Sequence, residues 1–449
     1  MSELAPIRVI GTWSELSATE RMVAVSRGTD KIFDPELREN ISALVEDVRL
    51  RGDAAVIDAL AKFDGVTVAP GGLRVTEAEF AAARAGISPE LLAAIRDGID
   101  HLRRFNEEIC KTGSWTFESE PGLMVGEKVS AIESAGLFVP SGKASYPSVL
   151  MQLGVPAVVA GVRNIAVVVP PVPGSDGVVD PACLVVASEL GITNVFRANG
   201  PAGVAALAFG TESFPKVRKV VGPGSPAVAA AQIEIQRWGT VTTMLLGPSE
   251  SLILADDSAD PWLLAADLLN EAEHGPDSSS VLVTDSPALL EAAQKAVAEQ
   301  LLALPEPRAS YAKLALGTNG GVFLVKDMVE GAEVANAYAP EHMQIAVRDE
   351  DGVLEMLHDA GEILIGQWTP VSAANFIIGC PASLPTSGFA KVSSGITADT
   401  FRKKSAIAKA DKRAINRMTP SILAFTAHEG FPAHGFAASV RLDYPERQD

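Results

Sequence analysis

Cysteine is scarce in this 449-residue sequence, which contains only Cys110, Cys183 and Cys380. An odd number of widely spaced cysteines indicates neither a disulfide framework nor a cysteine-based zinc site. We expect each one to be a small buried hydrophobic side chain rather than a nucleophile. This usage fits a reducing compartment, so we expect a cytoplasmic protein.

Long hydrophobic runs are also missing, although 47% of the residues are hydrophobic. The most apolar stretch, residues 157–172, is interrupted by Arg163 and Asn164 and ends in two prolines, so it cannot span a membrane. The N-terminus lacks the basic and apolar regions of a signal peptide. We therefore expect no membrane partner.

Basic residues are in the minority, because 37 Lys and Arg face 56 Asp and Glu, for a net charge of −19. Such an acidic chain is not expected to have nucleic acid or an anionic membrane surface as its main partner. Basic side chains do gather at residues 402–413, a pattern that favours a solvated or interface surface over an anion site.

Several short motifs with a known mechanism are absent. The sequence has no G-x-G-x-x-G fingerprint, Walker A motif, G-x-S-x-G elbow or H-E-x-x-H pair. The glycine-rich turns at Gly142 and at residues 222–224 could bring backbone amides close to a phosphate, although each alone is more typical of a plain turn. Internal repeats and low-complexity segments are also lacking.

The length predicts two or more domains. Apolar spacing predicts helices over 34–63 and 77–106. From residue 134 onward, short apolar runs alternate with helical patterns, which is typical of an α/β fold with mainly parallel sheets. For residues 396–449 we expect helix and loop. The predicted strands are 136–140, 164–170, 194–198 and 219–221, followed by 252–255, 280–284, 321–325 and 363–366.

The first candidate site lies at the end of a helix predicted over residues 260–273. Glu271 and His274 are three positions apart, so they share one face of its last turn. A carboxylate and an imidazole placed in this way can bind one metal ion. Taken alone, such a pair is more often a solvated helix end.

Three further polar segments contain candidate residues. Glu341 and His342 follow Pro340 and offer an acid–base couple, although the proline favours an exposed turn and a plain surface turn is an open alternative. Asn375 and His434 lie in other segments bounded by glycine or proline. A set made of Glu, His, Asn and His could bind zinc through nitrogen and oxygen atoms.

The order of these segments resembles the histidinol dehydrogenase family over nearly the full length of the chain. The segments that carry the resemblance are G-L-F-V-P-S-G-K-A-S-Y-P-S-V-L-M (136–151), V-G-P-G-S (221–225), L-G-P-S-E (246–250), A-E-H-G-P-D-S (272–278), Y-A-P-E-H (338–342), G-Q-W-T-P-V-S (366–372), L-P-T-S-G (384–388), S-S-G-I (393–396) and E-G-F-P-A-H (429–434).

The resemblance implies two incomplete Rossmann-like domains with mainly parallel sheets, plus small helical N- and C-terminal segments. It implies a homodimer in which C-terminal residues of one chain complete the active site of the other. The boundaries that we expect are an arm at 1–30, a discontinuous first domain at 31–133 and 249–395, a second domain at 134–248 and a dimerisation segment at 396–449.

The activity implied is oxidation of a small primary alcohol through an aldehyde to a carboxylate, with Zn²⁺ positioning the substrate and NAD accepting hydride. Glu341 and His342 match the acid–base pair. The resemblance places the zinc ligands at Glu271, His274, Asn375 and His434, and the cofactor contacts at Phe138, Ala202 and Ser225. It places the substrate contacts at Ser148, Ser249, Glu271, His274, His342, Asn375, Glu429 and His434.

Two departures from the family pattern concern the metal ligands. Glu271 replaces a glutamine and Asn375 replaces an aspartate, so the ligand set keeps its total charge, which argues that metal binding is retained.

Other departures concern the substrate and the cofactor. Ala382 replaces a histidine and cannot form its hydrogen bond, which favours a small polar alcohol other than histidinol; true L-histidinol oxidation is the alternative. Phe138, Ala202 and Ser225 replace a tyrosine, a glutamine and an asparagine, so NADP is not excluded. A zinc hydrolase and a non-catalytic small-molecule binder are further alternatives.

Overall fold

The computed structural model describes residues 6–27, 34–141, 145–243 and 247–445. The chain divides into two compact units. The first comprises Met1–Glu107 and Glu133–Phe401, and the second comprises Glu108–Ile132 and Arg402–Asp449. The first unit contains two parallel sheets and the second contains an antiparallel one, so each is described in turn.

One sheet of the first unit has four strands, all parallel. Its strands are continuous apolar runs because helices cover both faces, and nearly all their residues are buried. Its order is β6 (Val195–Arg197), β5 (Asn164–Val169), β4 (Ser134–Phe138) and β7 (Lys219–Val221).

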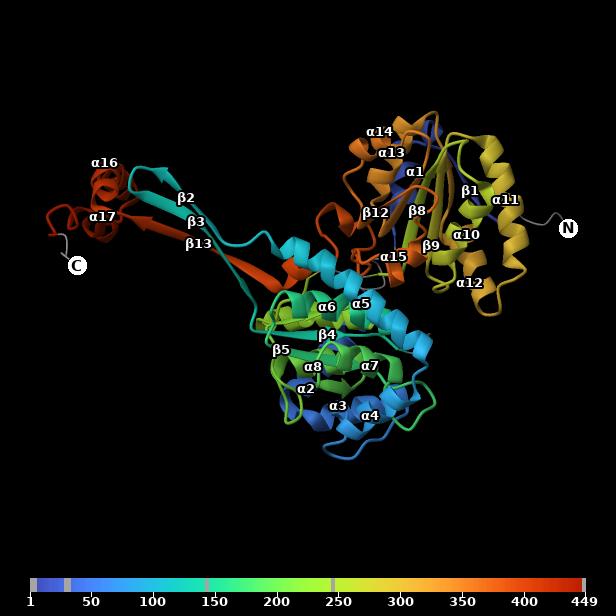
Figure 1. Cartoon of the computed structure of the whole chain (residues 1–449), viewed down its shortest axis with the longest axis horizontal. Coiled ribbons are helices and arrows are strands. Elements are labelled where there is room, and N and C mark those ends of the chain that lie inside the picture. Colours follow the sequence, from blue (N-terminus) through green and yellow to red (C-terminus); the bar gives the residue numbers. More distant parts are fainter. Residues whose placement is uncertain (1–5, 28–33, 142–144, 244–246, 446–449) are drawn as a thin grey trace. The chain divides into compact units, whose positions relative to one another are not determined.

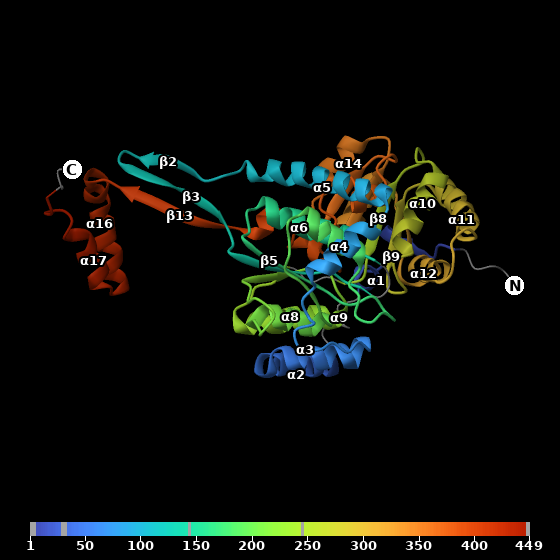
Figure 2. The same cartoon turned by 60° about the horizontal axis from the view of Figure 1, so that its bottom comes forward.

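Helices pack on both faces of this sheet (Figures 1 and 2). Alanine and glycine make up much of α8, which lets it approach the strands closely and bury every residue except Phe209. On one face lie α8 (Gly200–Phe209) and α9 (Pro226–Ile235), backed by α2 (Pro35–Arg51) and α3 (Asp53–Ala59). On the other lie α6 (Pro147–Val159) and α7 (Pro181–Glu189), with α4 (Glu77–Gly86) and α5 (Pro89–Cys110).

The other sheet of the first unit has six parallel strands. Two hydrophobic clusters fill the spaces between its faces and their helices. The order is β1 (Val9–Thr12), β10 (Gly321–Leu324), β9 (Ser279–Thr284), β8 (Glu250–Ala255), β11 (His342–Ala346) and β12 (Glu362–Ile365). The helices are α10 (Pro261–Ala272), α11 (Pro287–Leu301) and α12 (Arg308–Leu314) on one face, and α1 (Ala18–Val25), α13 (Met328–Tyr338) and α14 (Glu350–Met356) on the other.

The register of this sheet brings three polar residues to one edge. His342 is paired with Ser251 of β8 on one side and with Glu362 of β12 on the other. Because the strands are parallel, their first residues Glu250, His342 and Glu362 all lie at the amino edge of the sheet. This edge carries the candidate site.

The second unit is a three-stranded antiparallel sheet followed by two helices. The prediction of only helix and loop for 396–449 is wrong here, because β13 is a strand. Nearly all its residues are exposed, so the sequence shows no apolar alternation, and the strand forms by pairing with β3. The elements are β2 (Trp115–Glu120), β3 (Leu123–Ala131), β13 (Arg402–Ala410), α16 (Lys412–Glu429) and α17 (Pro432–Ser439).

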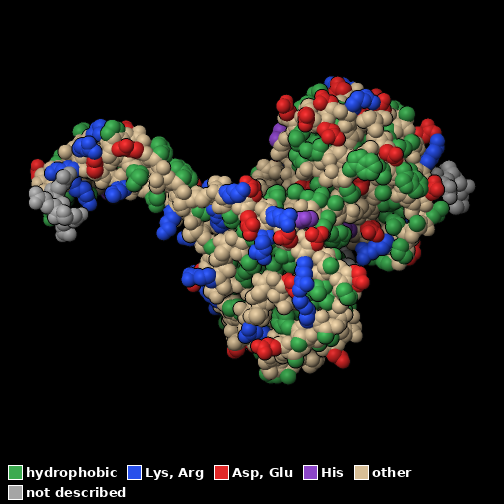
Figure 3. Space-filling view, in the orientation of Figure 1, with side chains coloured by type: hydrophobic (Ala, Val, Ile, Leu, Met, Phe, Trp, Pro, Cys, Tyr) green, Lys and Arg blue, Asp and Glu red, His purple; other side chains and the backbone are tan. Residues whose placement is uncertain are grey.

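The surface of the first unit carries side chains of both signs. Figure 3 shows acidic and basic groups interspersed on the visible face rather than collected in fields of one sign. Among the described residues, no helix has the length and apolarity needed to cross a membrane.

The predicted fold class is confirmed, because the first unit is α/β with parallel sheets. Each strand predicted in this unit is present within a few residues of its expected bounds. Two strands of this unit were missed: β1, which lies in the predicted N-terminal arm, and β11. The exposed turn expected at Glu341 and His342 is wrong. Both residues are buried, at 9% and 3% exposure. The predicted domain boundaries stay a prediction.

Candidate active site

The end of α10 places one carboxylate in the interior. Asp260 caps the start of the helix by accepting hydrogen bonds from the N–H groups of Trp262 and Leu263. Glu271 lies in the last turn, with a side chain that is completely buried. The Nδ1 atom of His274 lies 3.0 Å from Glu271 Oε1 and 3.2 Å from Ser249 Oγ. The structure thus brings three of the predicted residues together.

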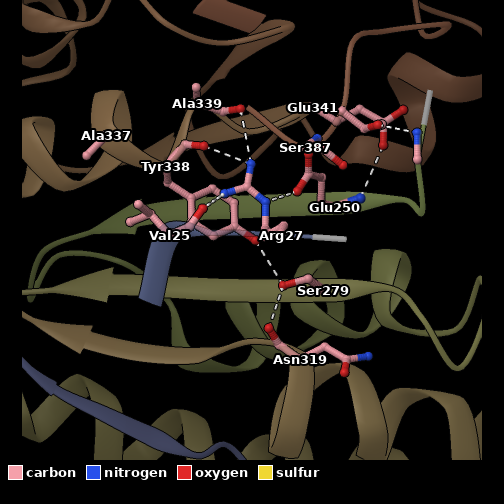
Figure 4. Close-up of polar contacts among 12 residues, drawn as sticks. Val25, Arg27, Glu250, Ser279, Asn319, Ala337, Tyr338, Ala339, Glu341 and Ser387 are labelled. Atoms are coloured by element: carbon pink, nitrogen blue, oxygen red, sulfur yellow. Dashed lines mark hydrogen bonds and ion pairs between the residues drawn. The ribbon is translucent and has the colours of Figure 1, made fainter. Parts of the chain in front are cut away.

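A turn after α13 places Glu341 and His342. The helix ends at Tyr338, Ala339 adopts a left-handed conformation with φ 51°, and β11 begins at His342. Oε2 of Glu341 accepts a hydrogen bond of 3.1 Å from the N–H of Glu250 (Figure 4). The backbone of β8 therefore fixes the carboxylate of Glu341.

Glu362, the residue paired with His342 on the neighbouring strand β12, holds the imidazole in place. Its Nδ1 atom is hydrogen-bonded to Oε1 of Glu362, and both side chains are buried. Its Nε2 atom lies 3.9 Å from Oε1 of Glu341, too far for a hydrogen bond. With Nδ1–H donating to Glu362, Nε2 is the atom of His342 that takes up or releases a proton.

Burial and charge shift the pKa values of this pair. Burial alone would lower the pKa of His342, but Glu341, Glu362 and Glu271 outweigh it and raise the pKa to about 10. Burial raises the pKa of Glu341 to about 8, with His342 opposing this effect and Glu271 and Glu250 adding to it. Both groups can therefore exchange protons well above the usual range of a carboxylate.

Glu271 and His274 shift each other's pKa values in the directions expected for an acid beside a base. Burial opposes ionisation of Glu271, yet His274 and His342 lower its pKa to about 2. Glu271 in turn raises the pKa of His274 against the effect of burial. The carboxylate is therefore ionised in the interior and needs positive charge beside it.

The residues present fit a bound cation. Neither oxygen of Glu271 accepts a hydrogen bond of good geometry, although both are completely buried and His274 Nδ1 lies 3.0 Å from Oε1. A buried carboxylate without hydrogen bonds is costly unless a cation compensates it. Ligand atoms of Glu271, Glu341 and His342 lie within 4.8 Å of one another, close enough to share one ion. Carboxylate and imidazole donors are those that zinc accepts.

The other predicted metal and substrate residues lie on separate elements. Asn375 is on α15 (Val371–Phe376), which packs against α10. Ser148 is half-buried in the first turn of α6. Glu429 ends α16 and His434 lies on α17, so both belong to the second unit and are exposed.

The three predicted cofactor residues all lie at the carboxyl edge of the four-stranded sheet. Phe138 ends β4, Ala202 is in the first turn of α8, and Ser225 caps α9. The turn after β7 needs glycine, because a Cβ on Gly222 would lie 2.0 Å from the carbonyl oxygen of Phe138. The turn at Gly142 lies outside the described residues.

Sequence reasoning missed Glu250 and Glu362. Glu362 directly precedes a predicted strand, but its partnership with His342 follows only from the parallel register. Glu250 lies in the quoted L-G-P-S-E segment, beside the predicted substrate contact Ser249, but no role was expected for it. The signal that could have revealed both is an acidic residue at the first position of a buried strand.

A buried acid–base pair beside a third buried carboxylate, in an α/β unit with parallel sheets, is typical of an enzyme active site. Residues 28–442 match the family model described as histidinol dehydrogenase. The family match assigns the class, an NAD-linked oxidoreductase. The chain belongs to the histidinol dehydrogenase family, whose members use NAD and Zn²⁺.

Individual relatives match over almost their whole length. The chain is 38% identical to a histidinol dehydrogenase of Methanosarcina barkeri, over 96% of this chain and 97% of the relative. It is 40% identical to a protein of Mesorhizobium japonicum named histidinol dehydrogenase homolog 2, over 96% and 97%. The structure matches a crystal structure of histidinol dehydrogenase from Elizabethkingia anophelis with a TM-score of 0.92 and 32% identity, over 98% of both chains.

Proposed function

We propose that this protein is a zinc-dependent L-histidinol dehydrogenase, oxidising the alcohol through an aldehyde to a carboxylate with NAD. The observation that carries the proposal is the buried set of Glu341, His342 and Glu362 beside the buried carboxylate of Glu271, which is paired with His274. Several relatives matched over almost their whole length have this name, which favours histidinol over the different alcohol that the sequence led us to prefer.

His342 is the proton acceptor in the first half of the reaction. When bound, zinc supplies a Lewis acid that orients the alcohol, and NAD supplies the hydride acceptor. Glu362 fixes the proton on Nδ1 of His342, so Nε2 is the basic atom of the imidazole. In this arrangement Nε2 removes the hydroxyl proton of the substrate.

Glu341 acts in the second half, when water must add to the aldehyde. Its carboxylate is held by the N–H of Glu250, and burial raises its pKa to about 8. A carboxylate with such a pKa is a stronger base than an ordinary one and can take a proton from water near neutral pH. His342 lies next to it and can receive or return the proton of the oxygen that reacts.

We also propose that two copies of the chain form the complete enzyme. Glu429 and His434 are the predicted substrate and zinc residues of the second unit, and both side chains are exposed. Exposed residues of these types can serve a site on another copy, which is what the family pattern implies.

A second candidate substrate is another small polar alcohol, and Ala382 favours it. The backbone N–H of Ala382 donates to Oε1 of Gln152 at 3.0 Å, so the main chain is fixed while the methyl side chain offers no hydrogen bond. A pocket without that donor is expected to discriminate less well for an imidazole. Some matched relatives are named homologs of histidinol dehydrogenase.

The test is NADH formation by zinc-loaded protein with L-histidinol, beside a panel of amino alcohols, diols and sulfonated alcohols. Turnover of histidinol with two NADH per substrate supports the proposal. Turnover of another alcohol alone supports the second candidate, and an Ala382→His variant is then expected to gain histidinol turnover. No turnover of any alcohol with NAD or NADP contradicts both.

A further inference from the structure

Arg27 is a buried arginine that the proposed mechanism does not use. It follows α1, and its side chain is only 10% exposed. Its Nε atom is paired with Glu250, and one Nη atom donates to the carbonyl of Val25 at 3.0 Å. The guanidinium lies 3.4 Å from the ring centre of Tyr338, a stacking contact.

The same guanidinium holds the turn that leads to the proposed acid–base pair. Its other Nη atom donates to the carbonyl of Tyr338 at 2.7 Å and to that of Ala339 at 3.4 Å (Figure 4). Ala339 is one of only two non-glycine residues with positive φ among those described. A strained conformation of this kind persists only where surrounding contacts hold it.

Arg27 reaches Glu341 by a second route through Glu250. The carboxylate of Glu250 is buried between Arg27 and the N–H of Ser387, while its backbone N–H donates to Glu341. Without Arg27, the negative charge of Glu250 would be uncompensated in the interior beside Glu341. Glu250 already raises the pKa of Glu341, so the charge of Glu250 acts on the proposed acid–base pair.

We propose that Arg27 is a positioning residue that clamps the Tyr338–Ala339 turn and the Glu250 carboxylate, and thereby fixes Glu341 and His342 for the reaction. The guanidinium is connected to Glu341 and His342 in two independent ways. One is through the backbone carbonyls of the turn, and the other is through Glu250. Arg27 itself contacts neither member of the pair in the described structure. The inference rests on the proposed function for its kinetic part, whereas its structural part can be measured without turnover.

The first variant is Arg27→Ala, assayed with saturating NAD and alcohol. We expect kcat to fall about 10²-fold, because a displacement of about 1 Å at a reacting group has that effect. We expect KM for NAD to stay unchanged. Guanidinium chloride at non-denaturing concentration should restore at least a tenth of the lost rate by filling the cavity, while sodium chloride of the same ionic strength and urea should not.

Two controls separate positioning from general stabilisation. The double variant Arg27→Ala, Glu250→Gln should show no guanidinium rescue, because the ion has lost its carboxylate partner. Arg21 is matched to Arg27, since it lies on the same arm, donates to a carbonyl and stacks on Trp13 at 5.1 Å. Arg21→Ala should keep the wild-type kcat.

Hydrogen exchange of residues 335–345, followed by mass spectrometry, tests the clamp without turnover. Exchange in this segment should be faster in Arg27→Ala than in wild type, and unchanged in Arg21→Ala. If the wild-type protein oxidises no alcohol, the proposed function is wrong. The exchange result then tests by itself whether Arg27 holds the Tyr338–Ala339 turn. If Arg27→Ala does not fold, Arg27→Lys is used, since lysine retains the charge but has one nitrogen in place of the separate Nε and Nη atoms that reach Glu250 and the two carbonyls.

Wild-type kcat in Arg27→Ala, equal rescue of the single and double variants, or unchanged exchange in residues 335–345 would each overturn the inference. For Arg27→Lys, wild-type kcat or unchanged exchange would do the same.

Discussion

The hydrogen bond between Glu362 and His342 can be tested by Glu362→Gln. The substitution keeps the size of the side chain but removes the charge that holds the imidazole. Both side chains are buried, at 5% and 3% exposure, so water cannot replace the carboxylate. The amide can also present its N–H₂ group to Nδ1, which would favour the tautomer with its proton on Nε2.

The size of the effect follows from this bond. A hydrogen bond to a charged group contributes about 1.5–3 kcal/mol. At about 1.4 kcal/mol for each pKa unit, losing it lowers the pKa of His342 by about 1–2 units. The pKa of His342 falls rather than rises because the lost carboxylate stabilises the protonated imidazole. His342 must be neutral to accept a proton, so the acid limb of the kcat profile should move to lower pH by that amount.

The rate itself should fall between about 10²-fold, as for loss of a residue that orients a metal-site ligand, and about 10⁴-fold, as for loss of the carboxylate in a protease triad. The assay is kcat against pH with zinc-loaded protein, with melting temperature measured on the same samples. Glu333→Gln, an exposed position on α13, serves as the control. A Glu362→Gln enzyme with wild-type kcat and an unmoved limb would refute the assigned role.

Three further predictions concern the metal, the cofactor edge and the core. Removing metal with a chelator should abolish turnover and added Zn²⁺ should restore it, whereas Glu271→Ala protein should bind zinc at least tenfold more weakly in a competition titration. Gly222→Ala should lower NAD affinity measured by calorimetry, because its Cβ would lie 2.0 Å from the Phe138 carbonyl, while Gly86→Ala, with no atom within 4 Å of its Cβ and no positive φ, should not. Leu254→Ala should lower the free energy of unfolding in urea by about 2–5 kcal/mol, because the side chain is fully buried between α13 and the sheet.

Local pattern was enough to predict most of the first unit. Continuous apolar runs and helix-ending residues located the parallel strands and α10, and the spacing of Glu271 and His274 placed them together. These features depend on residues close in sequence, so the chain itself displays them.

The missed features depend on residues far apart in sequence. Strand β11 contains His342 and Gln344, which no apolar pattern would mark as buried. Gln344 is stabilised in the interior by a hydrogen bond of 2.9 Å to Asp267, far away in the sequence. Glu362 meets His342 through strand register, and Arg27 meets Glu250 across more than 200 residues. Burial of such groups is set by partners that only the fold supplies.

Glu250, His342 and Glu362 lie at the amino edge of the six-stranded sheet, and this position has an electrostatic consequence. At this edge α10 and α13 end, so their free carbonyls give it a partial negative charge that favours cations. The predicted cofactor residues lie instead at the carboxyl edge of the other sheet, where α8 and α9 begin and free N–H groups favour phosphates. The proposed metal site and the predicted dinucleotide site thus lie at opposite edges of two separate sheets, so a substitution that alters one site leaves the helix ends at the other unchanged.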